Sequence, residues 1–594
     1  MSTSHGTTET RSSDLEDNLR ASVSSWPVDR LQSLFIALLA AAVIPFFVNL
    51  DDASIWDANE AYYVETPREM IERGDWINPS FNYEPRFNKP VLSYWIVGGL
   101  YQLFGVSLAV ERAAIAGAAV IMLIAVWLMA RASSAHLLAP LLATLGLAAG
   151  PRFFMFSRRI FVDMAVTAMM TLTLLFFVLA ERYPARRRLF LLLMYVSVGL
   201  GVLTKGPVAA VIPMLVFTAY LGVHREFGRL REMMIPAGIL IALAIAAPWY
   251  IALYMQHGWT HITAFFIGEN VGRFTETIGV QARGPDFYIP VLFSDMLPWS
   301  LCLPAVVMTW WADRRRNRDA VSVRIRTLLL LWIAIIVVLF SLSQTKQDLY
   351  IFPIVAAVAA LGGDWVARAL SSGYPAAAGH HREREVRLPP DNTEAWFKWT
   401  LTVVGLVMTL LGVGMLYLFS EDRTVYIDGT RAAAMITIVG GLVVAVLSWR
   451  GRYAVSVSAV LLVFIAFNWV LAVRALPDFE RYKPVVPLSR IIEQRAGPDD
   501  VVAHFDVALP SMVFYLRRHI AGGLDEGTFT RLLGSGRRVF AVLPADRYEA
   551  LKATFGVETC VIGRHLTSDI RLRSLLEQQP PPEVLLITNR CPAP

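Results

Sequence analysis

The sequence has few charged residues and almost no cysteine. Only 17% of its 594 residues are Asp, Glu, Lys or Arg, three are cysteine, and 55% are hydrophobic, so the mean hydropathy is +0.50. Soluble globular chains carry about 25% charged residues. The shortage of charge therefore excludes a soluble protein and indicates a polytopic membrane protein.

The chain also lacks the features of a signal peptide and of a nucleic-acid-binding protein. Residues 1–30 contain neither an apolar signal core nor a small-residue cleavage site, so the first hydrophobic run is expected to remain as an anchor. The net charge is +6, but the Arg residues fall in short clusters between apolar runs, where they act as orientation signals. We therefore expect a lipid bilayer and no nucleic acid as partner.

Apolar runs close to the length that crosses a bilayer recur along the chain. They lie at about 31–50, 109–130, 137–154, 162–180, 189–204, 207–223, 234–255, 289–311, 327–343, 349–369, 397–419, 431–449 and 453–474. Val91 to Gly105 is shorter and has polar and aromatic residues along one side, which favours a helix at the membrane interface. The predicted fold is mainly α, with about 13 membrane spans.

The distribution of Arg predicts the topology, because short cytoplasmic loops collect positive charge. With a cytoplasmic N-terminus, that side holds Arg131, "ERYPARRRL", "HREFGRLRE", "DRRRNRDAVSVRIR", "HHREREVR" and "RGR". The expected organisation is a cytoplasmic tail at 1–30, a transmembrane catalytic domain at 31–476 with a first outer loop at 51–108, and an outer domain at 477–594.

Unusual polar groups gather on the predicted outer side, close to the membrane boundary. Ionisable groups near hydrocarbon are costly and usually face a cavity or a partner. Carboxylates mixed with Lys and Arg suggest a phosphate-bearing ligand beside acid and base groups. The alternative is that these are ordinary loop charges, some of them paired with one another. The residues are Asp57, Glu60, Glu65, Arg68, Glu69, Tyr83, Lys89, Asp163, Lys205, His257, His261, Glu269, Arg273, Lys346, Asp348 and Tyr350.

Several of these segments resemble a known family. The stretch "ANEAYYVETPREMIERGDWINPSFNYEPRFNKPVLSYW" resembles the first periplasmic loop of bacterial aminoarabinose transferases and their relatives. These belong to the C-type glycosyltransferases, which include the protein O-mannosyltransferases. The resemblance continues in order through "SRRIFVDMAVTAMM", "LGVLTKGPVAAVIP", "APWYIALY", "GENVGRF", "MLPWSLCLPA" and "SQTKQDLYIFP", and covers roughly residues 31–370.

The resemblance implies transfer of a sugar, with inversion, from a polyprenyl-phosphate donor to an acceptor on the outer face of the bacterial inner membrane. An anionic leaving group on a lipid tail needs cations at membrane depth, which Lys89, Arg273 and Lys346 supply. A carboxylate must take the acceptor proton. The candidate phosphate ligands are those cations and Tyr350. The candidate catalytic carboxylates are Asp163, Asp57 and Glu60. The candidate substrate contacts are Tyr62, Tyr63, Tyr83 and Glu269.

The chain departs from the family pattern at three points. The family commonly has Asp-Glu where this chain has Asn59-Glu60, so Asp57 is the candidate replacement. Aminoarabinose transferases have Glu-Lys-Pro and Glu-His where this chain has Asn88-Lys89-Pro90 and Glu269-Asn270. These changes remove a Glu and a His that could hold a metal. His257 and His261 have helical spacing but no clear third ligand, so we predict no metal, with a divalent ion as the alternative.

After about Asp478 the long apolar runs stop. "DDVVAHF", "RRVFAVLP", "VETCVIG" and "EVLLITN" have the pattern of short buried strands, with helices expected near 508–518, 526–534 and 544–554. This indicates a small α/β domain outside the membrane, without a nucleotide-binding glycine motif. Cys560 and Cys591 both fall in it, so a disulfide and two separate thiols are both open.

The acceptor implied by the resemblance is lipid A, another envelope glycan, a lipid or a protein. The alternative function is a transporter or flippase of polyprenyl-linked sugars. A transporter is expected to have charges at the bilayer midplane and two repeated halves. Here the charges gather at one interface, which favours the enzyme.

Overall fold

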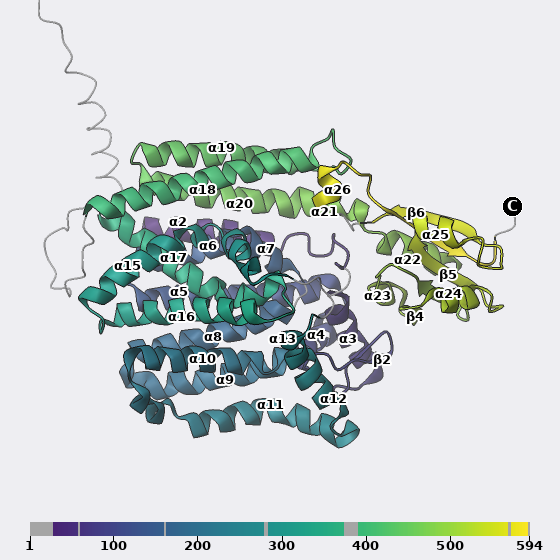
Figure 1. The fold of residues 1–594 in the computed structure, drawn as a ribbon, viewed down its shortest axis with the longest axis horizontal. Coiled ribbons are helices and arrows are strands. Elements are labelled where there is room, and N and C mark those ends of the chain that lie inside the picture. Colours follow the sequence, from purple (N-terminus) through teal and green to yellow (C-terminus); the bar gives the residue numbers. More distant parts are fainter. Residues whose placement is uncertain are drawn as a thin grey trace, which may run out of the picture.

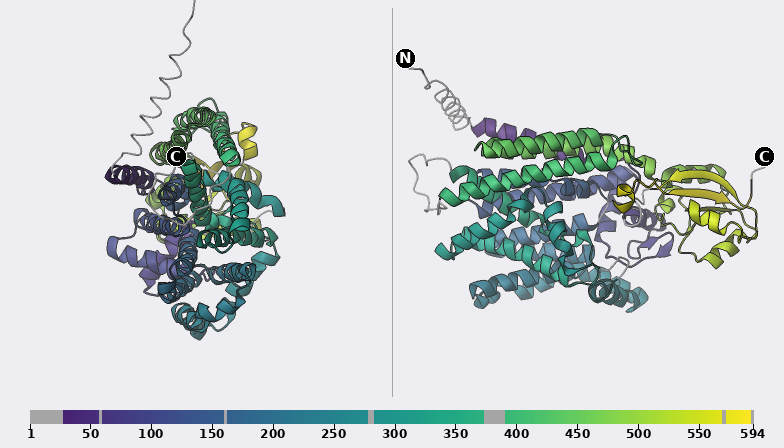
Figure 2. Two further views of the ribbon diagram at one scale, coloured as in Figure 1. Left: turned by 90° about the vertical axis from the view of Figure 1, so that its left-hand side faces the viewer. Right: turned by 45° about the horizontal axis from the view of Figure 1, so that its top comes forward.

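The structure is a computed structural model that describes residues 28–56, 60–159, 162–277, 283–372, 390–567 and 572–591. It consists of a bundle of long helices with a small α/β unit at one end (Figure 1). The end-on view shows the helices stacked in several layers (Figure 2). Asp57 lies outside the described residues, as does most of the predicted N-terminal tail.

The bundle is formed by apolar helices whose neighbours in space are often distant in sequence. Its helices are α2 (Val28–Val43), α5 (Leu108–Ser133), α6 (Leu138–Ala149), α7 (Pro151–Arg158), α8 (Val162–Arg182), α9 (Arg187–Lys205), α10 (Val208–His224), α11 (Ile235–His257), α14 (Tyr288–Asp295), α15 (Leu303–Arg316), α16 (Val321–Leu342), α17 (Val355–Ser372), α18 (Pro390–Phe419), α19 (Thr430–Trp449) and α20 (Tyr453–Val470).

The thirteen predicted apolar runs all correspond to helical segments. Among the described residues, nine helices are long and apolar enough to cross a membrane, and two bent helix pairs bring this to eleven. Two shorter apolar helices, Gln32–Phe46 and Val208–His224, coincide with the remaining runs. The chain is therefore a multi-pass membrane protein, and about thirteen crossings remain a prediction.

The two bent pairs follow from local sequence. The helices α6 and α7 meet at 62°, where Gly150 is extended and Pro151 begins the next helix. Proline is favoured at that first position, because its missing N–H would have no helical partner there. The segments Pro285–Asp295 and Trp299–Arg316 meet at 111°. Each bend interrupts one predicted run.

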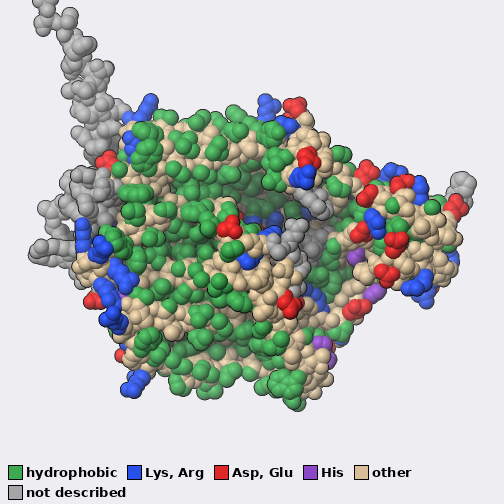
Figure 3. Space-filling view, viewed as in Figure 1, with side chains coloured by type: hydrophobic (Ala, Val, Ile, Leu, Met, Phe, Trp, Pro, Cys, Tyr) green, Lys and Arg blue, Asp and Glu red, His purple; other side chains and the backbone are tan. Residues whose placement is uncertain are grey.

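The surface divides into an apolar body and two charged ends. Figure 3 shows a broad band of hydrophobic side chains over the bundle, with Lys and Arg gathered at the end away from the α/β unit. The helices α11 and α18 carry exposed apolar side chains such as Leu240 and Leu410. Such an extended apolar surface matches a lipid environment.

One cluster of buried charge ties three spans together. Arg326 on α16 contacts Asp313 at 3.0 Å and Asp364 at 2.9 Å, and Arg368 contacts the same two carboxylates at 3.0 and 3.2 Å. The four formal charges cancel, and each guanidinium has two acidic partners. Paired in this way, ionised groups can lie within an apolar bundle.

The first loop has its own short elements. They are α3 (Glu60–Arg73), β1 (Ser80–Phe81), β2 (Glu84–Pro85) and α4 (Leu92–Phe104). The helix α4 confirms the helix predicted from Val91 to Gly105, and its 13 residues are fewer than a span requires. These elements lie at the end of the bundle that faces the α/β unit (Figure 1).

The α/β unit contains a five-stranded mixed sheet in the order β4-β3-β5-β7-β6. The strands are β3 (Val501–His504), β4 (Ile520–Ala521), β5 (Val539–Pro544), β6 (Cys560–Leu566) and β7 (Glu583–Thr588), and the helices are α22 (Val485–Arg495), α23 (Met512–Leu516), α24 (Glu526–Leu533), α25 (Ala545–Leu551) and α26 (Leu572–Leu576). The four predicted strands and three predicted helices are confirmed. Short β4 and the helices α22 and α26 were not predicted.

Alternation along β5 builds a core on both faces of this sheet. Phe540 and Val542 pack into one apolar cluster, whereas Ala541 and Leu543 pack into another. This is the two-residue period of a strand that is buried on both sides. None of the described helices after Tyr482 is long and apolar enough to span a membrane.

The Cys560–Cys591 bridge is present, with a Cα separation of 5.5 Å, and Cys302 is a buried free thiol. Thiol labelling of unreduced, denatured protein should therefore modify one cysteine, and reduction should raise the number to three. The bridge closes a loop with a sequence separation of 31 residues. Its loss should destabilise the unit by about 3–4 kcal/mol in the chain-entropy model. Three reactive cysteines before reduction would rule the bridge out.

Candidate active site

Glu269 is the centre of a charged cluster assembled from two distant segments. It lies on the π-helix η4 (Ala264–Gly272), which precedes the short α13 (Arg273–Thr275). Its Oε2 accepts from Lys89 Nζ at 3.1 Å and from Arg273 Nε at 3.2 Å, and its Oε1 accepts from Asn88 Nδ2 at 3.0 Å. We call Lys89, Glu269 and Arg273 the outer ion cluster.

Burial and pairing oppose one another in this cluster. Burial lowers the pKa of Lys89 to about 8, although Glu269 acts to raise it. Burial would raise the pKa of Glu269, but Lys89 and Arg273 outweigh it and hold that pKa below the usual range. The carboxylate is therefore ionised, and the Lys89 amine loses its charge near pH 8.

A second ion pair joins the spans α8 and α9. Lys205, at the end of α9, pairs with Asp163 in the first turn of α8. The Lys205 amine also lies 5.8 Å from the centre of the Tyr350 ring. The structure thereby joins a predicted carboxylate, a predicted tyrosine and a lysine noted in the outer constellation but not assigned a role.

The segment around Lys346 is bound to the outer ion cluster through the backbone. The Arg273 carbonyl accepts from Thr345 N at 3.1 Å and from Ser343 Oγ at 3.0 Å, and the Arg273 guanidinium interacts with Tyr350. Lys346 itself is 5% exposed and donates to the Ser343 carbonyl. Tyr350 and Arg273 therefore lie together, whereas Lys346 uses one donor within its own loop.

Glu60 lies in a separate group of charges. It begins α3, is 2% exposed, and its Oε2 accepts from Trp56 N at 2.7 Å. Burial raises the pKa of Glu60, although Arg112, Arg159 and Lys483 act to lower it. Among the described residues, Glu60 and Glu269 have no partner in common, so the predicted carboxylates fall into separate groups.

The three predicted tyrosines of the first loop differ in their surroundings. Tyr63 stacks on Tyr94 at 5.9 Å and lies near enough to Asp163 and Glu269 for both to affect it. The Tyr62 ring lies 3.8 Å from the Arg86 guanidinium. The Tyr83 hydroxyl accepts from Arg68 at 3.1 Å, and its amide donates to Glu69 at 3.0 Å.

These contacts divide the tyrosines by position. Tyr63 lies near both Glu269 and Asp163, whereas Tyr83 is bonded within the first loop itself. Arg68 is also paired with Glu65 and Glu72. This part of the constellation therefore matches the alternative of loop charges that pair with one another.

The two histidines contact residues of the first loop. His257 Nε2 lies 2.7 Å from Asn78 Oδ1, and the His261 ring stacks on Phe87 at 4.0 Å. Phe87 directly precedes Asn88 and Lys89. Both rings therefore support the segment that carries Lys89.

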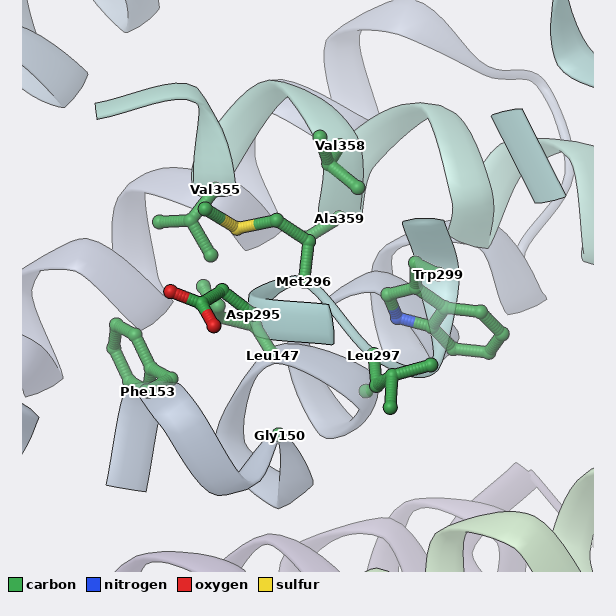
Figure 4. Close-up of a pocket in the computed structure, with 11 residues that line it drawn as sticks. Leu147, Gly150, Phe153, Asp295, Met296, Leu297, Trp299, Val355, Val358 and Ala359 are labelled. Carbon is green, nitrogen blue, oxygen red and sulfur yellow. The ribbon is translucent and has the colours of Figure 1, made fainter. Parts of the chain in front are cut away.

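A small apolar hollow lies beside the Asp295–Trp299 bend (Figure 4). Met296, Leu297, Phe153 and Val355 line it, with the Asp295 carboxylate at one side (Figure 4). Asp295 is paired with Arg152 at 3.0 Å, and Arg152 also pairs with Asp348. Its lining contains none of the predicted site residues, so we do not place the site there.

Comparison with known proteins gives a consistent result. The family described as dolichyl-phosphate-mannose-protein mannosyltransferase matches residues 88–251. An undecaprenyl phosphate-alpha-4-amino-4-deoxy-L-arabinose arabinosyl transferase of Pectobacterium carotovorum is 29% identical over 396 residues, which cover 65% of this chain and 66% of that protein. Its namesake in Pseudomonas aeruginosa strain LESB58 is 30% identical, covering 58% and 62%. The matched parts thus span just under two thirds of these relatives.

A solved structure agrees over the whole described fold. The crystal structure of ArnT from Cupriavidus metallidurans bound to undecaprenyl phosphate has a TM-score of 0.73 and 23% identity, and covers 95% of this chain and 99% of that one. The chain is a multi-pass membrane protein with this fold. The predicted resemblance to the aminoarabinose transferases and protein O-mannosyltransferases, within the C-type glycosyltransferases, is confirmed.

The unusual protonation of Lys89 can be measured directly. Amine-reactive labelling followed by mass spectrometry should show half-maximal reactivity of Lys89 near pH 8, well below the usual lysine value of about 10.4. In Glu269→Gln the midpoint should move lower still, because the negative partner that favours the protonated amine is lost. Glu276→Gln, at an exposed position on the same segment, is the matched control. A midpoint at the usual value would contradict the burial of this amine.

Proposed function

We propose that the protein is an inverting glycosyltransferase that moves a sugar from a polyprenyl-phosphate donor to an envelope acceptor. The observation that carries this proposal is the outer ion cluster, in which Lys89 and Arg273 share one carboxylate beside Tyr350 and the Asp163–Lys205 pair. Two relatives are named as transferases from undecaprenyl phosphate. A lipid-linked anion suits cations placed at a membrane boundary.

The phosphate of the donor is proposed to bind Lys89 and Arg273, with Lys205 and Tyr350 next to it. As the bond between the anomeric carbon and the phosphate oxygen breaks, negative charge accumulates on the leaving phosphate. Cations fixed in a weakly screened site stabilise that charge. Lys346, whose amine also donates to Ser343, is proposed to support this group from the neighbouring loop.

The acceptor hydroxyl is proposed to attack the anomeric carbon from the face opposite the phosphate, which inverts the configuration. Its proton passes to a carboxylate. Asp163 and Asp57 are the proposed bases. Asp163 forms an ion pair with Lys205 in the first turn of α8. Glu60 contacts the Trp56 backbone, so its proposed role is to order the loop that carries Asp57.

Tyr63 is the proposed substrate contact closest to these groups. Tyr62 and Tyr83 are proposed to support the first loop, and Glu269 is proposed to support the cations. The proposed setting is the bacterial inner membrane, with residues 1–30 in the cytoplasm. In that orientation, the catalytic region at 31–476 opens to the outer face and the α/β domain at 477–594 is periplasmic. The Arg-rich end opposite the α/β unit supports this orientation (Figure 3).

The proposal is tested by supplying the purified protein with a panel of polyprenyl-phosphate sugars and with lipid A, glycan, lipid and protein acceptors. A glycosylated acceptor together with free polyprenyl phosphate is the expected result. Movement of the intact donor across a bilayer without a new glycosidic bond would instead identify the alternative, a flippase.

Replacement of the proposed bases should separate chemistry from binding. Asp163→Asn and Asp57→Asn should each lower transfer by about 10²–10⁴-fold, the usual contribution of a general base. Binding of polyprenyl phosphate should persist, because the donor cations remain. Glu60→Gln is the internal comparison. Wild-type turnover in both Asp variants would refute the assignment, and an effect confined to Glu60→Gln would move the base to Glu60.

Donor binding should depend on both cations and on pH. Lys89→Met and Arg273→Met should each weaken polyprenyl phosphate binding by about one to two decades, the value of a charge-assisted hydrogen bond. In the ligand-free protein the pKa of Lys89 is about 8, and the amine must be protonated to bind the phosphate. Wild-type affinity should therefore fall as pH rises above 8. Lys89→Met should lack that decline.

Lys552→Met removes one exposed positive charge from the α/β unit and is the matched control. Unchanged affinity in Lys89→Met and Arg273→Met, measured with the same lipid in nanodiscs, would show that these cations serve topology or solubility.

A further inference from the structure

We propose that the C-terminal α/β unit is part of the active site through Lys483, a positioning residue that fixes the first outer loop around Glu60. This inference deepens the proposed function and rests on it for its catalytic consequence. Its structural part concerns residues 45–56, Lys483 and Tyr515. It is carried by contacts between segments more than 400 residues apart.

The approach to Glu60 is a stretch of backbone whose carbonyls surround buried cations. Arg158, 8% exposed, donates to the carbonyls of Pro45, Val48 and Asn49. Arg112, 5% exposed, donates to those of Leu50, Ala53 and Ser54. We call residues 45–56 the carbonyl strap. A backbone whose carbonyls accept from buried cations at six of its twelve residues has a well-defined path.

Lys483 completes the strap from the C-terminal side. It lies just before α22 and is 7% exposed. Its amine donates to the Ser54 carbonyl at 3.0 Å and pairs with Glu480 at 2.8 Å. Ser54 therefore receives Arg112 and Lys483 together, one from the bundle and one from the C-terminal region.

The same amine contacts the residue that holds Glu60. Lys483 Nζ lies 4.6 Å from the centre of the Trp56 ring, and that ring stacks on Phe479 with centroids 5.0 Å apart. The Trp56 amide donates to Glu60 at 2.7 Å. Lys483 and Phe479 thus fix the side chain of Trp56, while Glu60 accepts from its backbone.

Two further contacts hold the first loop against the α/β unit. The Tyr515 hydroxyl, on α23, accepts from the Ile55 amide at 2.9 Å. Asn82 exchanges two hydrogen bonds with the Ile520 backbone, at 2.9 and 2.8 Å, and so occupies the edge of β4. The α/β unit therefore contacts the first loop both before and after α3.

The consequence is a division of labour between two separate groups of residues. None of the contacts of Lys483 described above involves the outer ion cluster, which is proposed to bind the donor. Loss of Lys483 should therefore disturb the strap and Glu60 without removing the donor phosphate ligands. In kinetic terms, kcat should fall while the KM for the donor stays close to its wild-type value.

The test uses the full-length protein in nanodiscs with Lys483→Met, Lys483→Arg and Tyr515→Phe. Tyr548→Phe is the control for a lost tyrosine hydroxyl, because among the described residues the Tyr548 hydroxyl bonds to Thr559, within the α/β unit. Lys552→Met is the control for a lost exposed charge. Hydrogen exchange over residues 45–60 and steady-state kinetics are measured on every variant.

In Lys483→Met, exchange over 45–60 should rise about tenfold or more and kcat should fall about tenfold or more, the change expected when a charge-assisted hydrogen bond is lost. Lys483→Arg should restore most of both, since it keeps the charge and the donors. Tyr515→Phe should raise exchange at Ile55, whereas both controls should match the wild type.

Wild-type exchange over 45–60 in both Lys483→Met and Tyr515→Phe would overturn the inference. So would an equal loss of kcat in Lys483→Met and Lys483→Arg, because general damage to packing would explain it. If the wild-type protein transfers no sugar to any acceptor, the proposed function fails. In that case the exchange measurements alone decide whether Lys483 positions the strap.

Discussion

Every charge placed beside the apolar bundle has to be matched by a partner, and this requirement organises both ends of the molecule. The Arg326, Arg368, Asp313 and Asp364 cluster meets it completely and ties three spans together. The outer ion cluster meets it with fewer acids, because Lys89 and Arg273 share the single carboxylate of Glu269. An anionic ligand is therefore favoured at the outer end, whereas the charges of the Arg326 cluster already balance one another.

This difference connects the fold to the proposed donor binding and transfer. Glu269 holds the two cations in position before a ligand arrives, so little reorganisation is needed when a phosphate binds. The depressed pKa of Lys89 reflects the cost of burying an amine, and a second anion would offset that cost. Of the carboxylates proposed to act as bases, Asp163 pairs with Lys205 and is not a member of this group.

Much of this architecture could be predicted from the sequence, because it depends on local patterns. Apolar runs near span length located the helices, and short apolar runs such as that of β5 located the strands. The pairing of Cys560 with Cys591 was only one of two possibilities, since sequence does not supply a Cα separation. Short β4 was missed because two residues give no periodic signal.

The pairings within the site could not be predicted, because they join residues far apart in the chain. Lys89 and Glu269 are separated by 180 residues, and Lys483 and Ser54 by 429. The carbonyl strap carries no side-chain signal at all, since its backbone oxygens do the binding. Family resemblance identified Asp163 and Lys89 as candidates, but only the folded chain shows which opposite charge each one meets.

The most direct measurement is a cryo-EM map of the protein in nanodiscs with a polyprenyl phosphate. The account predicts phosphate density in contact with Lys89 and Arg273, next to Tyr350, with the lipid chain against the apolar surface of the bundle. Phosphate density at the opposite, Arg-rich end, such as beside Arg314 and Arg315, with the outer ion cluster unchanged, would contradict it.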